Sequence, residues 1–106
     1  MPPALAASAT PSILELLGSP PARVLELGFA GIHAEPLRLA GFAVVVVEPD
    51  PAYLEQARAR AGEALAEAPP GRRFDAVVAP AGTDLRGVDA RRVLLVARDG
   101  SVAEGR

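Results

Sequence analysis

Arg23-Val-Leu-Glu-Leu-Gly-Phe-Ala-Gly31 opens the stretch that decides the fold, and Phe42-Ala-Val-Val-Val-Val-Glu-Pro-Asp50 closes it. The pattern predicts a strand, a glycine-containing turn, a short helix and a second strand that ends in an acid. Such a turn lets the backbone come close to an anion or a small cofactor. A carboxylate after the second strand can accept hydrogen bonds from a ribose. The stretch therefore indicates half of a nucleotide-binding α/β unit.

The segments around this stretch predict a parallel sheet. Val44–Val47 is apolar on both faces, which favours a parallel strand covered by helices on both sides. Asp50-Pro51 predicts a helix start, and apolar residues at helical spacing extend that helix to Ala68. Further strands are expected at Phe74–Ala79 and Arg92–Ala97. We therefore expect an α/β fold, a three-layer Rossmann-like domain whose mostly parallel sheet has about four strands in the order 2-1-3-4.

Composition limits the class of protein. The 106 residues suggest a single domain over 1–106, with a flexible tail at 1–11. Ser12-Ile-Leu-Glu15 has the spacing of a capping box and predicts the first helix. There is no Cys and only 1 His, so we expect no disulfide framework and no metal site.

Charge and hydropathy predict a soluble chain. The net charge is −2 and the 11 basic residues, all Arg, are scattered, so no nucleic-acid surface is evident. The longest apolar run, 41–47, is far shorter than a membrane span, and residues 1–10 lack the pattern of a signal peptide. The expected location is cytoplasmic, and the absence of Lys and Asn fits a GC-rich bacterial genome.

Candidate binding residues gather at the turn and after the second strand. Gly28 and Gly31 permit a tight bend next to a helix start. Glu48 follows Gly28 at the spacing expected for an acid that binds ribose hydroxyls. Thr83 and Asp84 lie in the loop nearest this expected site. The lone His33, at a helix start, is most simply a solvated residue, although a ligand contact is the alternative.

Several motifs, taken in order, resemble one protein family. Val24-Leu25-Glu26-Leu27-Gly28 is similar to the first motif of class I S-adenosylmethionine-dependent methyltransferases, and Val47-Glu48-Pro49-Asp50-Pro51 is similar to their second. Phe74–Ala79 resembles their fourth strand, and Val93–Val96 with Asp99-Gly100 resembles their fifth. The resemblance spans residues 12–100.

The resemblance implies a cofactor, S-adenosylmethionine, and a set of contacts to it. Glu26 and the backbone of Gly28 would face the methionine moiety, and Glu48 would hold the ribose. The loop Pro80–Asp84 would border the sulfonium and the acceptor. The implied cofactor-binding residues are Glu26, Gly28, Phe29, Ala30, Gly31, Glu48, Pro49 and Pro80. The resemblance assigns no catalytic residue.

The sequence also departs from the family pattern. Ala30 stands where the family has its second glycine. Between Ala68 and Phe74 there is no room for a third strand, and the final hairpin is expected to be absent. Three functions therefore stay open. The first is a small methyltransferase-like protein, and the second is a non-catalytic module that binds a partner or forms a homodimer through an exposed sheet edge. The third is an NAD-type nucleotide binder.

Overall fold

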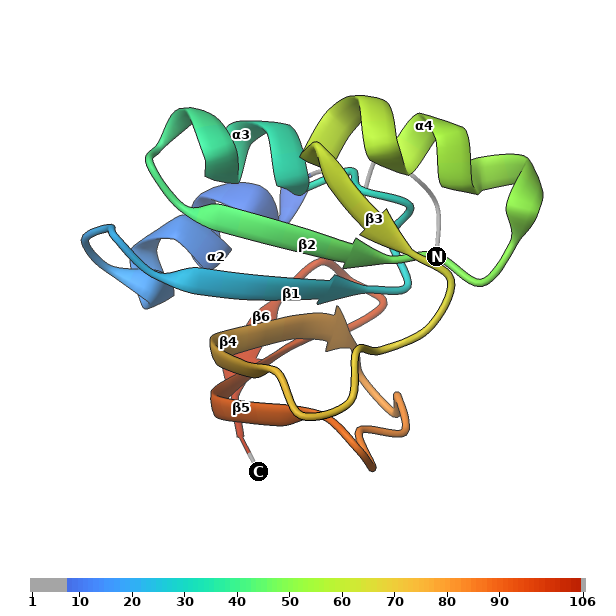
Figure 1. Ribbon diagram of the computed structural model, residues 1–106. Helices are drawn as coiled ribbons and strands as arrows, with labels where there is room; N and C mark the ends of the chain where they lie inside the picture. The colour runs from blue at the N-terminus through green and yellow to red at the C-terminus, as the bar shows by residue number, and fades with distance from the viewer. Residues whose placement is uncertain (1–7, 106) are drawn as a thin grey trace.

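The computed structural model describes residues 8–105, which form one six-stranded sheet with the order β3-β2-β1-β4-β5-β6 (Figure 1). The strands are β1 (Arg23–Leu27), β2 (Ala43–Val47), β3 (Glu63–Leu65), β4 (Arg73–Pro80), β5 (Asp89–Val96) and β6 (Val102–Glu104). The first five are parallel, and β6 pairs antiparallel with β5. The α/β class and the mostly parallel sheet are confirmed, and the four predicted strands lie in the predicted order.

Two further strands correct the prediction at the sheet edges. The helix expected to reach Ala68 ends at Ala61, because Gly62 has a φ of 81° and leaves the helical conformation. β3 follows at once and pairs with β2, and the Glu48 amide donates to the Leu65 carbonyl at 2.8 Å. At the other edge, β6 completes the hairpin that was expected to be absent. The homodimer stays a prediction, and its candidate edges are now two strands of three residues each.

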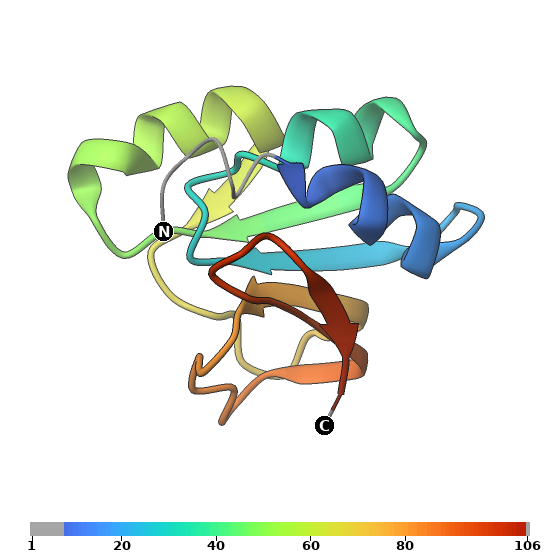
Figure 2. The ribbon, with the colours of Figure 1, turned by 180° about the vertical axis from the view of Figure 1, so that it is seen from behind.

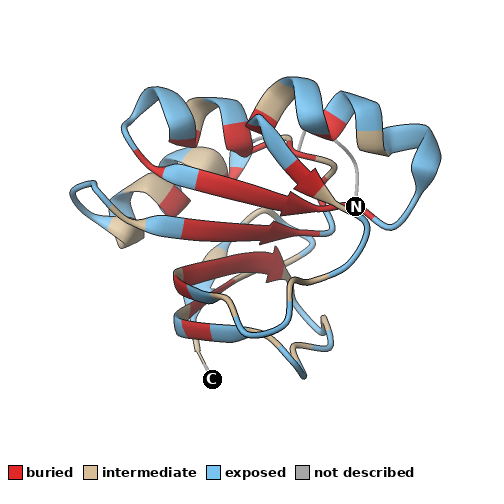
Figure 3. Cartoon of the chain, viewed as in Figure 1, coloured by how far each residue is buried: buried red, intermediate tan, exposed pale blue. Residues whose placement is uncertain are grey.

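Within residues 8–105, three helices cover one face of the sheet (Figures 1 and 2). They are α2 (Thr10–Leu17), α3 (Ala34–Leu39) and α4 (Pro51–Ala61). Buried residues of all three helices share one cluster with strand residues such as Val46 and Val78. The central strands are buried along almost their whole length (Figure 3). This helical layer supplies much of the hydrophobic burial that holds the fold.

The opposite face of the sheet is covered differently from the three-layer expectation. Its buried cluster contains Leu27, Val47 and Val77, and the residues packed against it from outside the strands lie in the segments 66–72 and 81–88. Within residues 8–105, no helix lies on this face. The reason is length, because the eight-residue connection 81–88 joins parallel strands β4 and β5 and is shorter than a helical crossover needs.

The helix starts follow the sequence in part. Asp50 caps α4 as predicted, since its Oδ1 accepts from the Ala52 amide at 2.9 Å. The predicted capping box at Ser12 is wrong, because α2 begins at Thr10 and its N-cap, Ala9, makes no side-chain cap. The tail predicted over 1–11 is also too long, since Ala9 is buried; its residues 1–7 lie outside the described residues.

Candidate functional site

The glycine turn after β1 meets β4 at the carboxyl end of the sheet. Gly28, Ala30 and Gly31 have φ values of 77°, 51° and 82°, in the left-handed region. A Cβ at Gly28 would lie 2.9 Å from two side-chain atoms of Pro80, the last residue of β4. Glycine is therefore required at position 28 both for its conformation and for the close approach of Pro80.

Glu26, on β1, lies beneath this turn, and its buried carboxyl group accepts a hydrogen bond from it. Its side chain is fully buried, and Oε1 accepts from the His33 amide at 3.5 Å. Burial raises the pKa of Glu26 to about 7. The nearby amides of His33, Gly31 and Ile32, together with the charge of Arg60, oppose this rise. The end of the turn thus directs the His33 amide at an internal carboxyl group.

His33 belongs to the same buried cluster, which corrects the expectation that it is solvated. Its Nδ1 lies 2.7 Å from Thr10 Oγ1, and the Phe29 ring packs edge-on at 4.7 Å between centroids. Burial lowers the pKa of His33 to about 4. His33 Nε2 and Glu26 Oε2 are buried and have no hydrogen-bond partner among residues 8–105. The cluster ties α2 to the turn, and its side chains are not among the lining residues of the two pockets on the opposite face of the sheet.

Glu48 follows β2 and is fixed at the end of the sheet. Its side chain is 9% exposed, and Oε2 accepts from the Asp50 amide at 2.8 Å. Within residues 8–105, Oε1 accepts no hydrogen bond. The local loop holds the carboxylate in place and leaves one oxygen for another donor.

A cleft of about 330 Å³ opens at the carboxyl ends of β1, β2 and β4, as expected for an open α/β sheet. It lies on the helix-free side, because Leu27 and Val47 of its floor belong to that cluster. Its lining residues are Leu27, Gly28, Val47, Pro49, Ala68, Thr83, Asp84, Arg86 and Val88. The loop after β4 is held by Thr83, whose hydroxyl donates to the Pro80 carbonyl at 2.6 Å.

The predicted site residues separate into two groups. Gly28 and Pro49 line the cleft, as do Thr83 and Asp84. The other predicted residues do not line the cleft, and most of them belong to the glycine turn or contact it: Glu26, Phe29, Ala30, Gly31, Glu48 and Pro80. Ala30 points its carbonyl at Arg60 Nη1, 3.2 Å away.

Sequence reasoning missed five lining residues, namely Leu27, Val47, Ala68, Arg86 and Val88. Leu27 and Val47 end β1 and β2, Ala68 was expected in a helix, and Arg86 and Val88 lie in the loop 81–88, which carries no regular spacing. Asp75, at the far end of β4, is not part of the cleft; its Oδ2 accepts from the Arg23 amide at 2.7 Å. Within residues 8–105, no group of three or more potential ligands is placed to hold a metal ion, and no helix is long and apolar enough to cross a membrane.

A second pocket, of about 230 Å³, lies beside the cleft on the same face. Its lining is wholly apolar: Val77, Leu85, Val88, Ala90 and Val93. Val88 belongs to both linings, so the loop 81–88 forms the wall between them.

No family model matches the chain, and no curated protein matches its sequence. Several solved structures share its fold, among them the following two. One is acetophenone reductase from Geotrichum candidum in complex with NAD, with 12% identity, a TM-score of 0.65, and coverage of 80% of this chain and 29% of that one. The other is a TehB-like SAM-dependent methyltransferase from Corynebacterium glutamicum, with 16% identity, a TM-score of 0.60, and coverage of 89% and 65%.

The chain therefore spans less than a third of the reductase and 65% of the methyltransferase. At these identities the likeness shows the fold alone. The fold is Rossmann-like. One of the two neighbours is a SAM-dependent methyltransferase, and the other is a reductase in complex with NAD.

Proposed function

We propose that the cleft binds S-adenosylmethionine and that the chain is a small methyltransferase-like protein. The observation that carries this proposal is the direction of the turn amides. The His33 amide donates to the buried Glu26 carboxyl group, and the amides of Gly31 and Ile32 lie near enough to lower its pKa. An internal acid thus accepts from an amide that a glycine turn would otherwise offer to a phosphate. A cofactor without phosphate fits this turn better than a dinucleotide does.

The cleft itself supports an adenosine ligand. Its floor and walls are mainly apolar, from Leu27, Val47, Pro49, Ala68 and Val88, which suits the flat face of a base. Glu48 directly precedes the lining residue Pro49, and within residues 8–105 its Oε1 accepts no hydrogen bond, so a ribose hydroxyl at the edge of the cleft would be its donor. Methyl transfer from a sulfonium depends mainly on positioning, so it does not require an acid–base pair in the lining.

A second candidate is an NAD-type nucleotide-binding domain. The likeness to an NAD-bound reductase supports it at the level of the fold. Glu48 also suits the ribose of any adenine nucleotide. The occupied turn counts against this candidate, because the pyrophosphate would have to compete with the Glu26 carboxyl group for the same amides.

Thermal unfolding in the presence of each ligand tests the proposal. S-adenosylmethionine, S-adenosylhomocysteine, NAD and NADP are compared at equal concentrations. A ligand at 100 times its Kd stabilises the folded state by about 2.7 kcal/mol, which raises the Tm of a chain of this size by roughly 10 °C. We expect a shift with the first two ligands only. A shift with NAD alone selects the second candidate, and no shift with any ligand rejects both.

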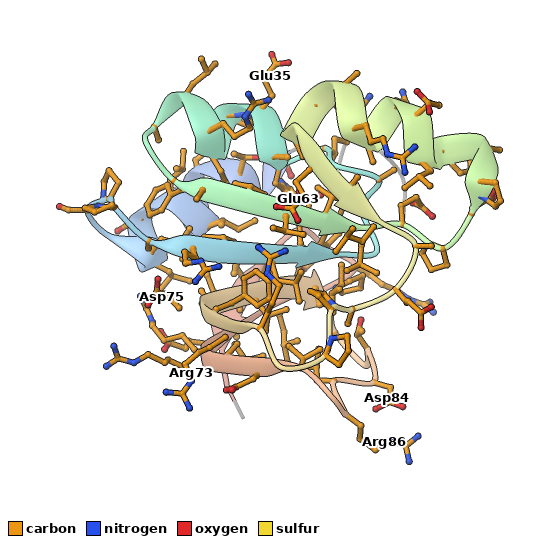
Figure 4. The ribbon with its side chains drawn as sticks, viewed as in Figure 1. Glu35, Glu63, Arg73, Asp75, Asp84 and Arg86 are labelled. Carbon is orange, nitrogen blue, oxygen red and sulfur yellow. The ribbon has the colours of Figure 1, made fainter. Side chains whose placement is uncertain are left out.

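Glu48→Ala then tests the site. The loss of its charge-assisted hydrogen bonds should weaken S-adenosylhomocysteine binding by roughly 10- to 100-fold in calorimetric titration. Glu35→Ala is the matched control, because Glu35 is an exposed acid on α3, away from the cleft (Figure 4). Equal affinity of both variants and the unaltered protein would show that Glu48 does not hold the ribose.

A further inference from the structure

The charged side chains in the cleft lining are Asp84 and Arg86, and they form an exposed ion pair. Arg86 Nη2 lies 2.7 Å from Asp84 Oδ2, and Arg86 Nε lies 3.0 Å from each Asp84 oxygen. The side chains of Arg86 and Asp84 are 91% and 59% exposed. The Arg86 amide also donates to Asp84 Oδ1 at 3.0 Å and holds the carboxylate in place. An ion pair so open to water adds little to stability, so the Arg86 guanidinium can exchange its partner at low cost.

The loop that carries this pair is anchored by the residue between its members. Leu85 lines the apolar pocket with Val77 and Val93, whereas Asp84 and Arg86 line the cleft. The Val88 amide donates to the Leu85 carbonyl at 3.1 Å and closes the turn. Figure 4 shows Asp84 and Arg86 together on the loop beyond β4, at the end of the sheet opposite Arg73 and Asp75. The two opposite charges are therefore held together at the rim of the cleft.

We infer that Asp84 and Arg86 bind the α-amino acid group of the ligand, with Asp84 on its ammonium and Arg86 on its carboxylate. An ammonium donates to a carboxylate, and a guanidinium donates two parallel hydrogen bonds to a carboxylate. An amino acid carries both groups on one carbon and so matches an adjacent acid and base. This inference rests on the proposed function, and it names the part of the ligand that the loop recognises.

The rest of the site agrees with this assignment. Glu26, which the family resemblance places at the methionine moiety, is fully buried and faces the turn amides. The other lining residues are uncharged, so Asp84 and Arg86 are the charged partners that the lining offers. A purely anionic group at this rim would meet the Asp84 carboxylate, whereas a zwitterion satisfies both side chains.

Two nucleosides that differ only in the amino acid end test the inference. S-adenosylhomocysteine carries the amino acid group at the end of its three-carbon chain on sulfur, and 5′-methylthioadenosine has a methyl group in place of that whole chain. Calorimetric titration compares both ligands on the unaltered chain, on Asp84→Asn and on Arg86→Gln. Arg73→Gln is the matched control, because Arg73 forms a similarly exposed ion pair with Asp89 at the opposite ends of the strands.

We expect S-adenosylhomocysteine to bind at least about 10-fold more tightly than 5′-methylthioadenosine, a typical effect of charge-assisted hydrogen bonds. Each cleft variant should remove most of that difference and leave 5′-methylthioadenosine binding unchanged, while Arg73→Gln changes neither. Equal affinity of the two nucleosides, or an equal loss for both in the variants, overturns the inference and leaves the proposed function standing. Binding of neither nucleoside rejects the proposed function together with the inference.

Discussion

Replacing Glu26 by Gln tests how the buried carboxyl group contributes to stability. The side chain is fully buried under the glycine turn, and its pKa is raised from 4.5 to about 7 by desolvation. Between these two values the unfolded chain loses the proton while the folded chain keeps it. Stability is therefore lost as the pH rises through this window. Gln is neutral at every pH and removes this loss.

The magnitude follows from the two pKa values. The gap between 4.5 and about 7, at about 1.36 kcal/mol for each pH unit, corresponds to a penalty of about 3 kcal/mol once Glu26 is fully ionised. The penalty is absent below pH 4.5 and complete above about pH 7. Gln keeps an oxygen for the His33 amide, and its amino group takes the place of Oε2, which has no partner within residues 8–105.

His33 contributes the opposite slope and must be separated from Glu26. Its pKa falls from 6.5 to about 4, so the unfolded chain takes up a proton first and stability is lost as the pH drops through that range. Between 4.5 and 6.5 the two slopes oppose each other in the unaltered chain. In Glu26→Gln only His33 of these two groups still makes the free energy of unfolding depend on pH. That free energy should therefore rise with pH and then level off.

Urea unfolding followed by circular dichroism, at about pH 5 and about pH 8, measures this difference. Relative to the unaltered chain, Glu26→Gln should gain roughly 2 to 3 kcal/mol between the two pH values, which moves the urea midpoint by about 1 M or more. Glu35→Gln makes the same change at an exposed site and should show no such gain. Identical pH profiles for Glu26→Gln and the unaltered chain would refute a buried carboxyl group with a raised pKa.

Two further substitutions test the turn. Gly28→Ala should destabilise the chain by roughly 2 kcal/mol or more in urea unfolding, because the new Cβ would lie 2.9 Å from Pro80 and the residue has a φ of 77°. A loss below about 0.5 kcal/mol, the size of an ordinary surface change, would contradict the close approach to Pro80. Ala30→Gly should stabilise the chain by about 0.5 to 1 kcal/mol, because Ala30 has a φ of 51° that costs a non-glycine residue energy, and a lower urea midpoint would argue against that conformation.

Much of the fold could be predicted from local patterns. The β1 and β2 strands, the turn and the Asp50 cap of α4 all appear where the spacing places them. β3 could not be distinguished from a continuing helix, because Ala64 and Leu65 also fit the apolar spacing of α4. Three residues become a strand through pairing with β2, a contact between residues that the local sequence does not encode.

The candidate site was predicted less completely than the fold. Gly28 and Pro49 follow from the ends of strands, which the sequence marks clearly. Arg86 and Val88 line the cleft because the loop 81–88 folds over the helix-free face, and nothing in its spacing shows this. His33 was expected in solvent, but the side chains of Thr10 and Phe29 enclose it after the chain folds.

The sequence by itself determined the parallel α/β order, the glycine turn and the acid after β2, because strands, caps and turns depend on residues close together in the chain. Only the tertiary structure decided where the turn amides point, which residues line the cleft and which face of the sheet α2, α3 and α4 cover. Those features depend on contacts across the sheet, such as Gly28 with Pro80 and Glu26 with the turn above it. Their energies come from burial and close packing, which exist only once distant segments have met.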